Sequence, residues 1–219
     1  MFQPIPMEEF LDRTKTKIPS FPTTLEFVVS LRDITEISAV QVMPKNYLEN
    51  IIRNITLEGD PSYRPYKNAE ISLARIDPHE LSVGQTFVER KKYQSILENF
   101  GNALMKEYCV PRGIAKAMPV IVFGKTETIE SAVALYLPPI IEANSRQFLM
   151  DGIHRNFIVM RTGTTIESIV IKNVDVPLPC DIGTWDIVNI VDEKPPREKR
   201  FHNLNVDFFR NLKFAGVDG

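Results

Sequence analysis

The chain has 219 residues, of which 43% are hydrophobic and 25% are charged, and its formal net charge at pH 7 is −2. A chain of this length accommodates one domain with additions, and none of its apolar runs reaches the roughly 18 residues needed to cross a bilayer, so we expect no membrane partner. The small net charge disfavours a domain-wide basic surface for nucleic acid but leaves room for a local patch.

Residues 1–68 predict an N-terminal extension, which consists of an arm and a small ββα-like unit. The first residues, Met-Phe-Gln-Pro-Ile-Pro, lack the basic and apolar segments of a secretory signal, so we expect a cytoplasmic location. Lysine, threonine and proline are frequent in the later part of the arm, residues 1–24. By apolar periodicity, the elements of the ββα-like unit are strands at 25–29 and 37–42 and a helix at 44–55. Glycine, prolines and tyrosines between residues 57 and 68 indicate a boundary.

Residues 69–174 predict a core in which strands and helices alternate, which is typical of an α/β or mixed α+β fold. The spacing of apolar residues predicts a long helix over 88–108 and a second helix over 153–162, which ends at Gly163. The remaining residues, 175–219, predict a C-terminal tail with short helices. The predicted strands are 69–76, 119–123, 132–136, 147–150 and 166–171, and the short helices of the tail are 185–191 and 206–212.

The most informative stretch is Asp151-Gly152-Ile153-His154-Arg155, where a predicted strand runs into a glycine turn and a helix. The first amides of a helix have no partner within it and carry the positive end of its dipole, so they can hold a phosphate. Gly152 lets the backbone approach a ligand closely, His154 is a titratable donor, and Arg155 offers a planar fork to phosphate oxygens. We predict a phosphate site at Gly152 and the three residues after it. An ordinary turn, with Asp151 as helix cap, stays open as the alternative.

The order of elements around this motif resembles the ParB/sulfiredoxin-like fold over residues 69–174, and the Gly-x-x-Arg from Gly152 to Arg155 is the most specific part of the resemblance. Members of that superfamily hold nucleotide phosphates at this turn. The resemblance implies ATP, ADP or another nucleotide as ligand, with Mg²⁺ on Asp151. Sulfiredoxins need a cysteine where this chain has Ile153, so their thiol chemistry is excluded.

The turn Ile76-Asp77-Pro78-His79-Glu80 resembles the free-serine kinase branch of the superfamily. In that branch a glutamate in a His-Glu pair after the first core strand is the general base. The resemblance implies a nucleotide-dependent phosphotransferase, or a nucleotide hydrolase, most concretely a kinase of a small hydroxyl compound such as serine. Glu80 would be the base and His154 would assist at the transferred phosphate. The alternative is that Asp77 and Glu80 only cap the next segment.

A ParB-like DNA-associated module, acting in plasmid maintenance or DNA modification without kinase activity, is the alternative function. The feature that would distinguish this function is a continuous basic surface that joins Arg197, Lys199 and Arg200 to Arg155. The charged residues from Glu89 to Lys92 and from Lys194 to Arg200 both predict solvated segments, with contact to a nucleotide or to nucleic acid as the alternative. A catalytically idle relative and a homodimer also stay open.

Overall fold

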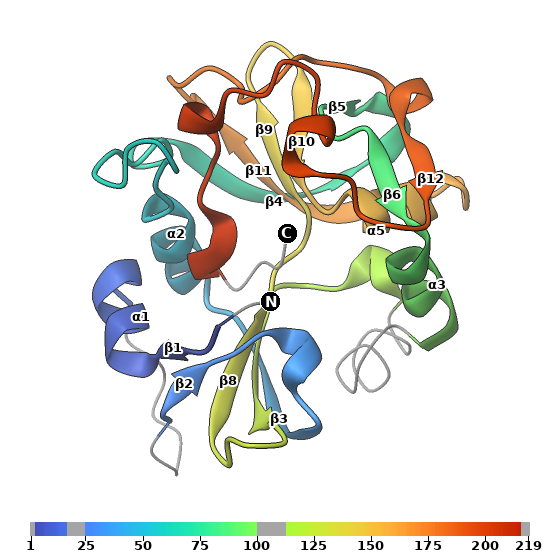
Figure 1. Ribbon diagram of the computed structural model, residues 1–219. Helices are drawn as coiled ribbons and strands as arrows, with labels where there is room; N and C mark the ends of the chain where they lie inside the picture. The colour runs from blue at the N-terminus through green and yellow to red at the C-terminus, as the bar shows by residue number, and fades with distance from the viewer. Residues whose placement is uncertain (1–2, 17–24, 100–112, 216–219) are drawn as a thin grey trace.

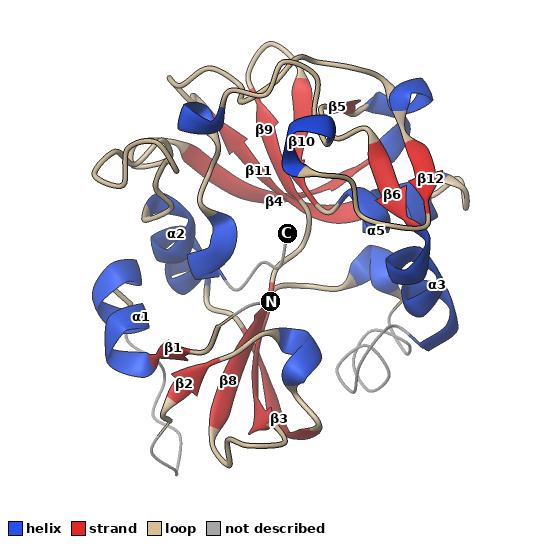
Figure 2. Ribbon diagram, in the orientation of Figure 1, coloured by secondary structure: helices blue, strands red, loops and turns tan. Residues whose placement is uncertain are grey.

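The computed structural model describes residues 3–16, 25–99 and 113–215, which form a mixed α/β fold with two five-stranded sheets. Figure 1 shows one sheet around β8 in the lower half of the view and the other around β9, β10 and β11 in the upper half. Helices and strands are interspersed along the chain, as Figure 2 shows. The predicted α+β class is confirmed.

The lower sheet joins strands from both sides of the predicted boundary at residue 68. Its strand order is β1-β2-β8-β7-β3. The bounds are β1 Ile5–Pro6, β2 Phe27–Val28, β8 Ala132–Tyr136, β7 Val120–Lys125 and β3 Glu36–Val42. Because β7 and β8 come from the middle of the chain, the boundary does not separate the sheets, and the division of the chain into three segments stays a prediction.

The upper sheet carries the motif at Gly152, and its strand order is β4-β11-β9-β10-β5. The bounds are β4 Glu70–Ile76, β11 Ile166–Lys172, β9 Ile140–Ala143, β10 Gln147–Asp151 and β5 Ser82–Val83. A separate parallel pair consists of β6 Phe87–Glu89 and β12 Asn189–Val191. The sequence predicted β4, β10 and β11 but missed β9, β5 and β6.

In the described part of the chain the α-helices are α1 Met7–Thr14, α2 Lys45–Arg53, α3 Arg90–Asn99 and α5 Ile153–Met160. The helix predicted from residue 88 begins at Arg90 because residues 87–89 pair with β12, and its part after residue 99 lies outside the described residues. The predicted tail helix over 185–191 is wrong: a 3-10 turn at Trp185–Ile187 leads into β12. A second 3-10 turn, Val206–Phe208, lies in the region predicted as the last helix. Among the described residues, none of the helices has the length and apolarity to span a membrane.

Alternating side chains divide the core into layers, as expected for strands that are buried on both faces. Ile140 of β9 packs into a core shared by both sheets with α1 and α2, whereas its neighbour Ile141 packs with Phe157 of α5 on the other face. The shared core includes Phe10, Ile52, Ile121, Leu135 and Ile169. The upper sheet is therefore fixed between α2 and α5, and this positions the start of α5.

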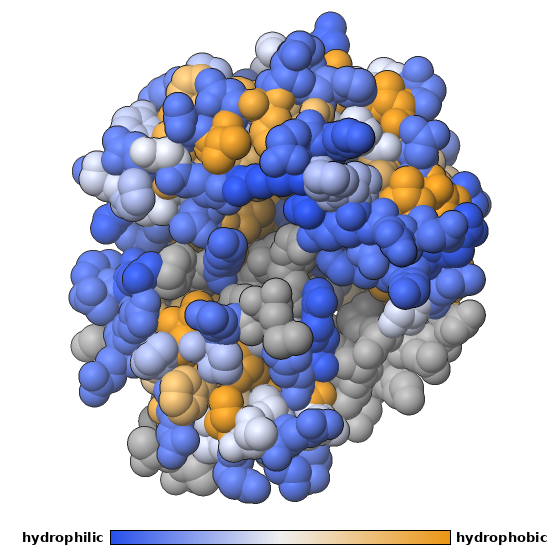
Figure 3. Space-filling model, in the orientation of Figure 1, coloured by the Kyte–Doolittle hydropathy of each residue, from blue (hydrophilic) through white to orange (hydrophobic). Residues whose placement is uncertain are grey.

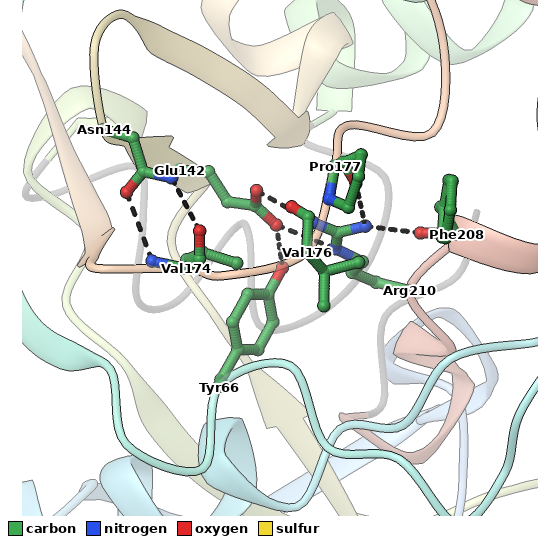
Figure 4. A network of polar contacts seen from close by, with 8 residues as sticks. All are labelled: Tyr66, Glu142, Asn144, Val174, Val176, Pro177, Phe208 and Arg210. Carbon is green, nitrogen blue, oxygen red and sulfur yellow. Dashed lines mark hydrogen bonds and ion pairs between the residues drawn. The ribbon is translucent and has the colours of Figure 1, made fainter.

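A buried ion pair ties the tail to this sheet, as Figure 4 shows. Glu142 of β9 and Arg210 of the tail are 2% and 1% exposed. Arg210 donates from Nε to Glu142 Oε1 at 2.8 Å and from Nη2 to Oε2 at 3.0 Å, and Tyr66 Oη donates to Oε1 at 2.6 Å. Burial and the neighbouring carboxylate raise the pKa of Tyr66 well above its usual value, so its hydroxyl stays protonated and remains a donor.

We predict that Arg210→Met lowers the free energy of unfolding by about 3–5 kcal/mol, because the variant leaves the Glu142 carboxylate buried without a cation. Urea denaturation measures this loss. The control is Glu70→Gln, which breaks an exposed pair with Lys172 across β4 and β11 and changes stability by less than about 1 kcal/mol. Replacing Glu142 by leucine as well should recover part of the loss. A loss in Arg210→Met no larger than in the control would contradict this account.

Candidate functional site

The turn between β10 and α5 has the strand-glycine-helix form that the sequence predicted. Gly152 adopts the left-handed conformation with φ of 96°, and a Cβ there would lie 2.8 Å from Cβ of Pro139. The pairing of β9 with β10 shifts register between Leu149 and Asp151, just before the turn. The N-cap residue of α5 is Gly152, which has no side chain to cap the helix, and the first amides of such a helix start can bind an anion.

Asn156 adds a buried polar group one helical turn from Gly152. Its side chain is fully buried, and Nδ2 donates to the Gly152 carbonyl oxygen at 3.1 Å. Its Oδ1 has no hydrogen-bond partner among the described residues. A buried acceptor without a partner is costly, and such atoms often mark a place where a ligand, an ion or a water completes the site.

Arg155 and Asp151 form an ion pair beside the turn. Arg155 Nη2 lies 3.0 Å from Asp151 Oδ2, and the two side chains are 15% and 17% exposed. The guanidinium also donates from Nη1 to the Leu137 carbonyl oxygen at 2.6 Å and lies over the ring of Tyr136. Arg155 therefore holds the link between β8 and β9 against the end of β10. Asp151 does not cap the helix, since its carboxylate pairs with this guanidinium.

His154 is held as a neutral imidazole. The backbone N–H of Glu89 donates to its Nε2 at 3.0 Å, which fixes the tautomer with the proton on Nδ1. Burial, together with the positive charges of Lys92, Arg155 and Lys194, lowers the pKa of His154 to about 3. At neutral pH the side chain is therefore a hydrogen-bond donor through Nδ1 and carries no charge.

Positive charges converge on His154 from three parts of the chain, and we call Lys92, Arg155 and Lys194 the cationic cluster. Lys92 belongs to α3 and Lys194 to the tail, in the two segments that the sequence predicted as solvated. Figure 3 shows hydrophilic side chains below β12 and around the start of α3. Sequence reasoning missed this convergence because it depends on the pairing of β6 with β12, for which neither segment gave a signal.

The cationic cluster is under mutual repulsion. Burial and the charges of Lys92 and Arg200 lower the pKa of Lys194, with a smaller contribution from Arg32, while the carboxylate of Glu89 opposes the effect. Like charges brought together in a partly desolvated place raise the free energy of the protein unless an anion joins them. The cluster therefore has the electrostatic character of an anion site.

The structure does not bring Glu80 to this turn. Strand β5 runs parallel to β10, so Glu80, which precedes β5, lies at the end of the sheet where β10 begins, whereas Gly152 follows the end of β10. His79, the neighbour of Glu80, contacts the far end of α5: its Nε2 lies 3.1 Å from the carbonyl oxygen of Met160, the last residue of the helix. The length of α5, about 10 Å, therefore separates this contact from the turn at Gly152. Glu80 is exposed there, and its role as general base stays a prediction.

Comparison with known proteins identifies one family. A family model described as the ParB CE domain matches residues 47–182, which is more than half of the chain. No curated protein and no solved structure matches the chain. The match contains the turn at Gly152 and the two strands before it, β9 and β10. It ends before β12, so Lys194 lies outside the matched region.

We predict that stability falls on acidification because of His154. The unfolded chain takes up a proton near pH 6.5, whereas the folded protein resists this down to about pH 3, so in that window the unfolded state binds more protons. The free energy of unfolding should fall by about 2 kcal/mol between about pH 7.5 and about pH 5 from this group alone. Urea denaturation across that pH range measures the change.

The comparison of two variants isolates the contribution of His154. His154→Gln presents an amide oxygen that can accept the Glu89 N–H but does not titrate, so this variant should lose the pH-dependent component. His202 is exposed, and His202→Gln should leave the component intact. An unchanged pH profile in His154→Gln would show that the imidazole is not held neutral by its surroundings.

Proposed function

The chain belongs to the ParB CE domain family, and from this premise we propose that it binds a nucleotide through its phosphate groups at the turn between β10 and α5. ATP or ADP is the first choice of ligand. The observation that carries the proposal is the uncapped start of α5 beside the cationic cluster. Backbone amides at Gly152 and the next residues, with the Nδ1–H of His154, would donate to the phosphate oxygens.

The residues beside the turn also suit Mg²⁺. This ion prefers oxygen ligands and takes most of them from water and phosphate, so one or two protein oxygens are enough. Asp151 offers a carboxylate, and Asn156 has a buried amide oxygen without a described partner. A bound Mg²⁺ would share Asp151 with Arg155 and would neutralise charge on the phosphates.

We further propose that the protein transfers a phosphoryl group from the bound nucleotide to a small hydroxyl compound, such as free serine. This chemistry needs a carboxylate that takes the proton of the acceptor hydroxyl. Glu80 is the candidate from the resemblance to the free-serine kinases. Glu89 is favoured by its position, since its amide contacts His154 and its carboxylate acts on Lys194.

Serine-dependent formation of ADP tests this activity and separates the two candidate bases. We expect Glu89→Gln to lower the rate about a hundredfold or more, in line with the loss of a general base, and Glu80→Gln to stay near the wild-type rate. The reverse order would assign the base to Glu80. Absence of serine-dependent turnover, in a protein that still binds ATP, would contradict this activity with this acceptor.

A DNA-associated module is the second candidate function, and it has its own supporting observation. The positive charges of Arg200 and Lys194 act on each other, and that of Lys194 also acts on His154, so positive charge from the tail reaches the turn. Arg197, in contrast, is paired with Glu58. DNA binding that weakens steeply with salt would support this candidate, because contacts to the phosphate backbone release counterions.

We predict that Gly152→Ala weakens nucleotide binding about tenfold or more, whereas Gly163→Ala leaves it unchanged. Both glycines have positive φ, so alanine strains the backbone in each variant by about 1–2 kcal/mol. Only at Gly152 does the new Cβ meet Pro139, and the resulting shift displaces the first amides of α5. Gly163 follows the other end of the helix and has open space around it.

The measurement is a thermal-shift screen with ATP, ADP, CTP and GTP, each with and without Mg²⁺, followed by calorimetric titration of the ligand that raises the unfolding temperature most. A ligand that binds the folded state and not the unfolded state raises the unfolding temperature. If no nucleotide stabilises the wild type, or if Gly152→Ala binds as Gly163→Ala does, the phosphate site is not at this turn.

A further inference from the structure

We propose that the protein binds an acidic amino acid in a pocket beside the start of β4, which we call the β4 pocket. The pocket has a volume of about 370 Å³ and is lined by the loop that leads into β4, residues 62–68, and by Asn173 and Asp175 after β11. A pocket of this volume can hold a small organic molecule. The proposal is independent of the proposed function, because the β4 pocket shares no residue with the turn at Gly152.

Strand pairing places the β4 pocket at the other end of the upper sheet from Gly152. Lys172, the last residue of β11, lies opposite Glu70, the first residue of β4, so the segments before β4 and after β11 meet. Asp151, in contrast, lies opposite Ile140 at the beginning of β9, and β9 runs in the same direction as β11. Figure 1 shows the loop before β4 on the left of the upper sheet and α5 on the right.

The loop that forms one side of the β4 pocket is fixed from behind. Arg53 of α2 donates from Nη1 to the carbonyl oxygen of Lys67 at 3.0 Å and to that of Ala69 at 2.9 Å. Tyr66 lies between these residues and is fully buried, and its hydroxyl donates to Glu142. A ligand therefore does not have to order this side of the pocket, which lowers the entropic cost of binding.

The segment after β11, which forms the other side, is fixed in the same way. Val174 exchanges two hydrogen bonds with the side chain of Asn144, at 3.2 Å from its N–H and 2.9 Å to its carbonyl oxygen, as Figure 4 shows. Arg210 donates to the carbonyl oxygen of Pro177 at 2.9 Å. Asp175 lies between these two attachments, so the backbone that carries its carboxylate is held in place.

The charged side chains that line the β4 pocket are those of Arg64, Lys67 and Asp175. All three are exposed, and within the described part of the chain none of them forms an ion pair. The neighbouring charges of Glu70 and Lys172 pair with each other across β4 and β11. The pocket therefore presents two positive charges and one negative charge to a ligand.

A ligand that complements these charges has two anionic groups and one cationic group. An acidic amino acid is the simplest such molecule, since its two carboxylates suit Arg64 and Lys67 and its ammonium group suits Asp175. A guanidinium can bind a carboxylate through two parallel hydrogen bonds. Asn68 and Asn173 also line the pocket, and their amide groups can donate to the remaining carboxylate oxygens.

Other classes of ligand fit the charges of the β4 pocket less well. A phosphate ester brings negative charge without a positive group, so it would meet the carboxylate of Asp175 unfavourably. A neutral sugar would leave all three charges without a counter-charge. A nucleic-acid strand could stack a base on Tyr63, which is 45% exposed, but its phosphates would meet the same carboxylate.

The test is NMR titration of the full chain with L-glutamate and L-aspartate, followed through the backbone amide signals. We expect saturable shifts at residues 62–68 and 173–175, with a dissociation constant of about 1 mM or lower, because ion pairs in contact with water are individually weak. N-acetyl-L-glutamate lacks the cationic group, and L-glutamine and L-serine lack the second carboxylate. Each of these three should bind about fivefold more weakly or worse.

Three variants assign the charges of the ligand to side chains. Arg64→Gln, Lys67→Gln and Asp175→Asn should each bind glutamate about fivefold more weakly or worse. Asp175→Asn should also lose the preference for glutamate over N-acetylglutamate, which general damage to the pocket would not cause. The matched control is Arg146→Gln, which removes an exposed cation from the hairpin between β9 and β10, outside the pocket, and should bind as the wild type does. Thermal unfolding checks that each variant is folded.

The remaining outcomes overturn the proposal. Absence of saturable binding of both acidic amino acids up to about 10 mM, tenfold above the expected constant, would do so. Equal binding of glutamate, glutamine and N-acetylglutamate would remove the charge argument. Shifts at Gly152 in place of the pocket would assign the amino acid to the turn. Binding of short single-stranded DNA that is lost in Tyr63→Ala would assign the pocket to nucleic acid. Nucleotide binding at the turn bears on none of these outcomes, so the proposed function is tested separately.

Discussion

The buried carboxylate of Glu142 constrains how the rest of the chain can be arranged. It lies on the face of β9 that meets the core shared by both sheets, where an unpaired charge costs several kcal/mol. Folding therefore requires a cation from elsewhere, and Arg210, which is 68 residues further along the chain, supplies it. The same guanidinium donates to the carbonyl oxygens of Val176, Pro177 and Phe208. One side chain thus joins the beginning and the end of the tail to the upper sheet.

With both ends of the tail fixed, its middle part crosses the molecule beside β6. Gly183 bridges to Val83 before β12 pairs with β6, and Gln85 bridges to Phe201 after it. The tail is therefore attached at several points between residues 183 and 201, and Lys194, three residues after the end of β12, lies near enough to act on His154. The ion pair in the core and the charges at the turn are consequently parts of one arrangement. This dependence gives a physical role to residues that follow the family match.

What the sequence predicted well was local. The turn at Gly152 and most strands of the upper sheet follow from apolar periodicity and from one glycine, so they could be located without the fold. The environment of the turn could not, because strand pairings between distant segments decide it. The parallel pairing of β5 with β10 separates Glu80 from the turn, and that of β12 with β6 brings Lys194 near. Arg155 shows the same limit, since the carbonyl oxygen of Leu137, to which its guanidinium donates, comes from a segment 18 residues earlier in the chain.

The neutrality of His154 explains how so many positive charges can surround one turn. A protonated imidazole would add another cation to the cationic cluster, whose members already repel one another. A neutral imidazole supplies an N–H donor without this cost, and its Nε2 anchors the Glu89 amide that begins the lysine-bearing segment. Functional sites often hold like charges close together, and the resulting repulsion lowers the stability of the folded protein. An anionic ligand at the turn, as proposed, would relieve it, so its binding and the stability of the folded chain would be thermodynamically linked.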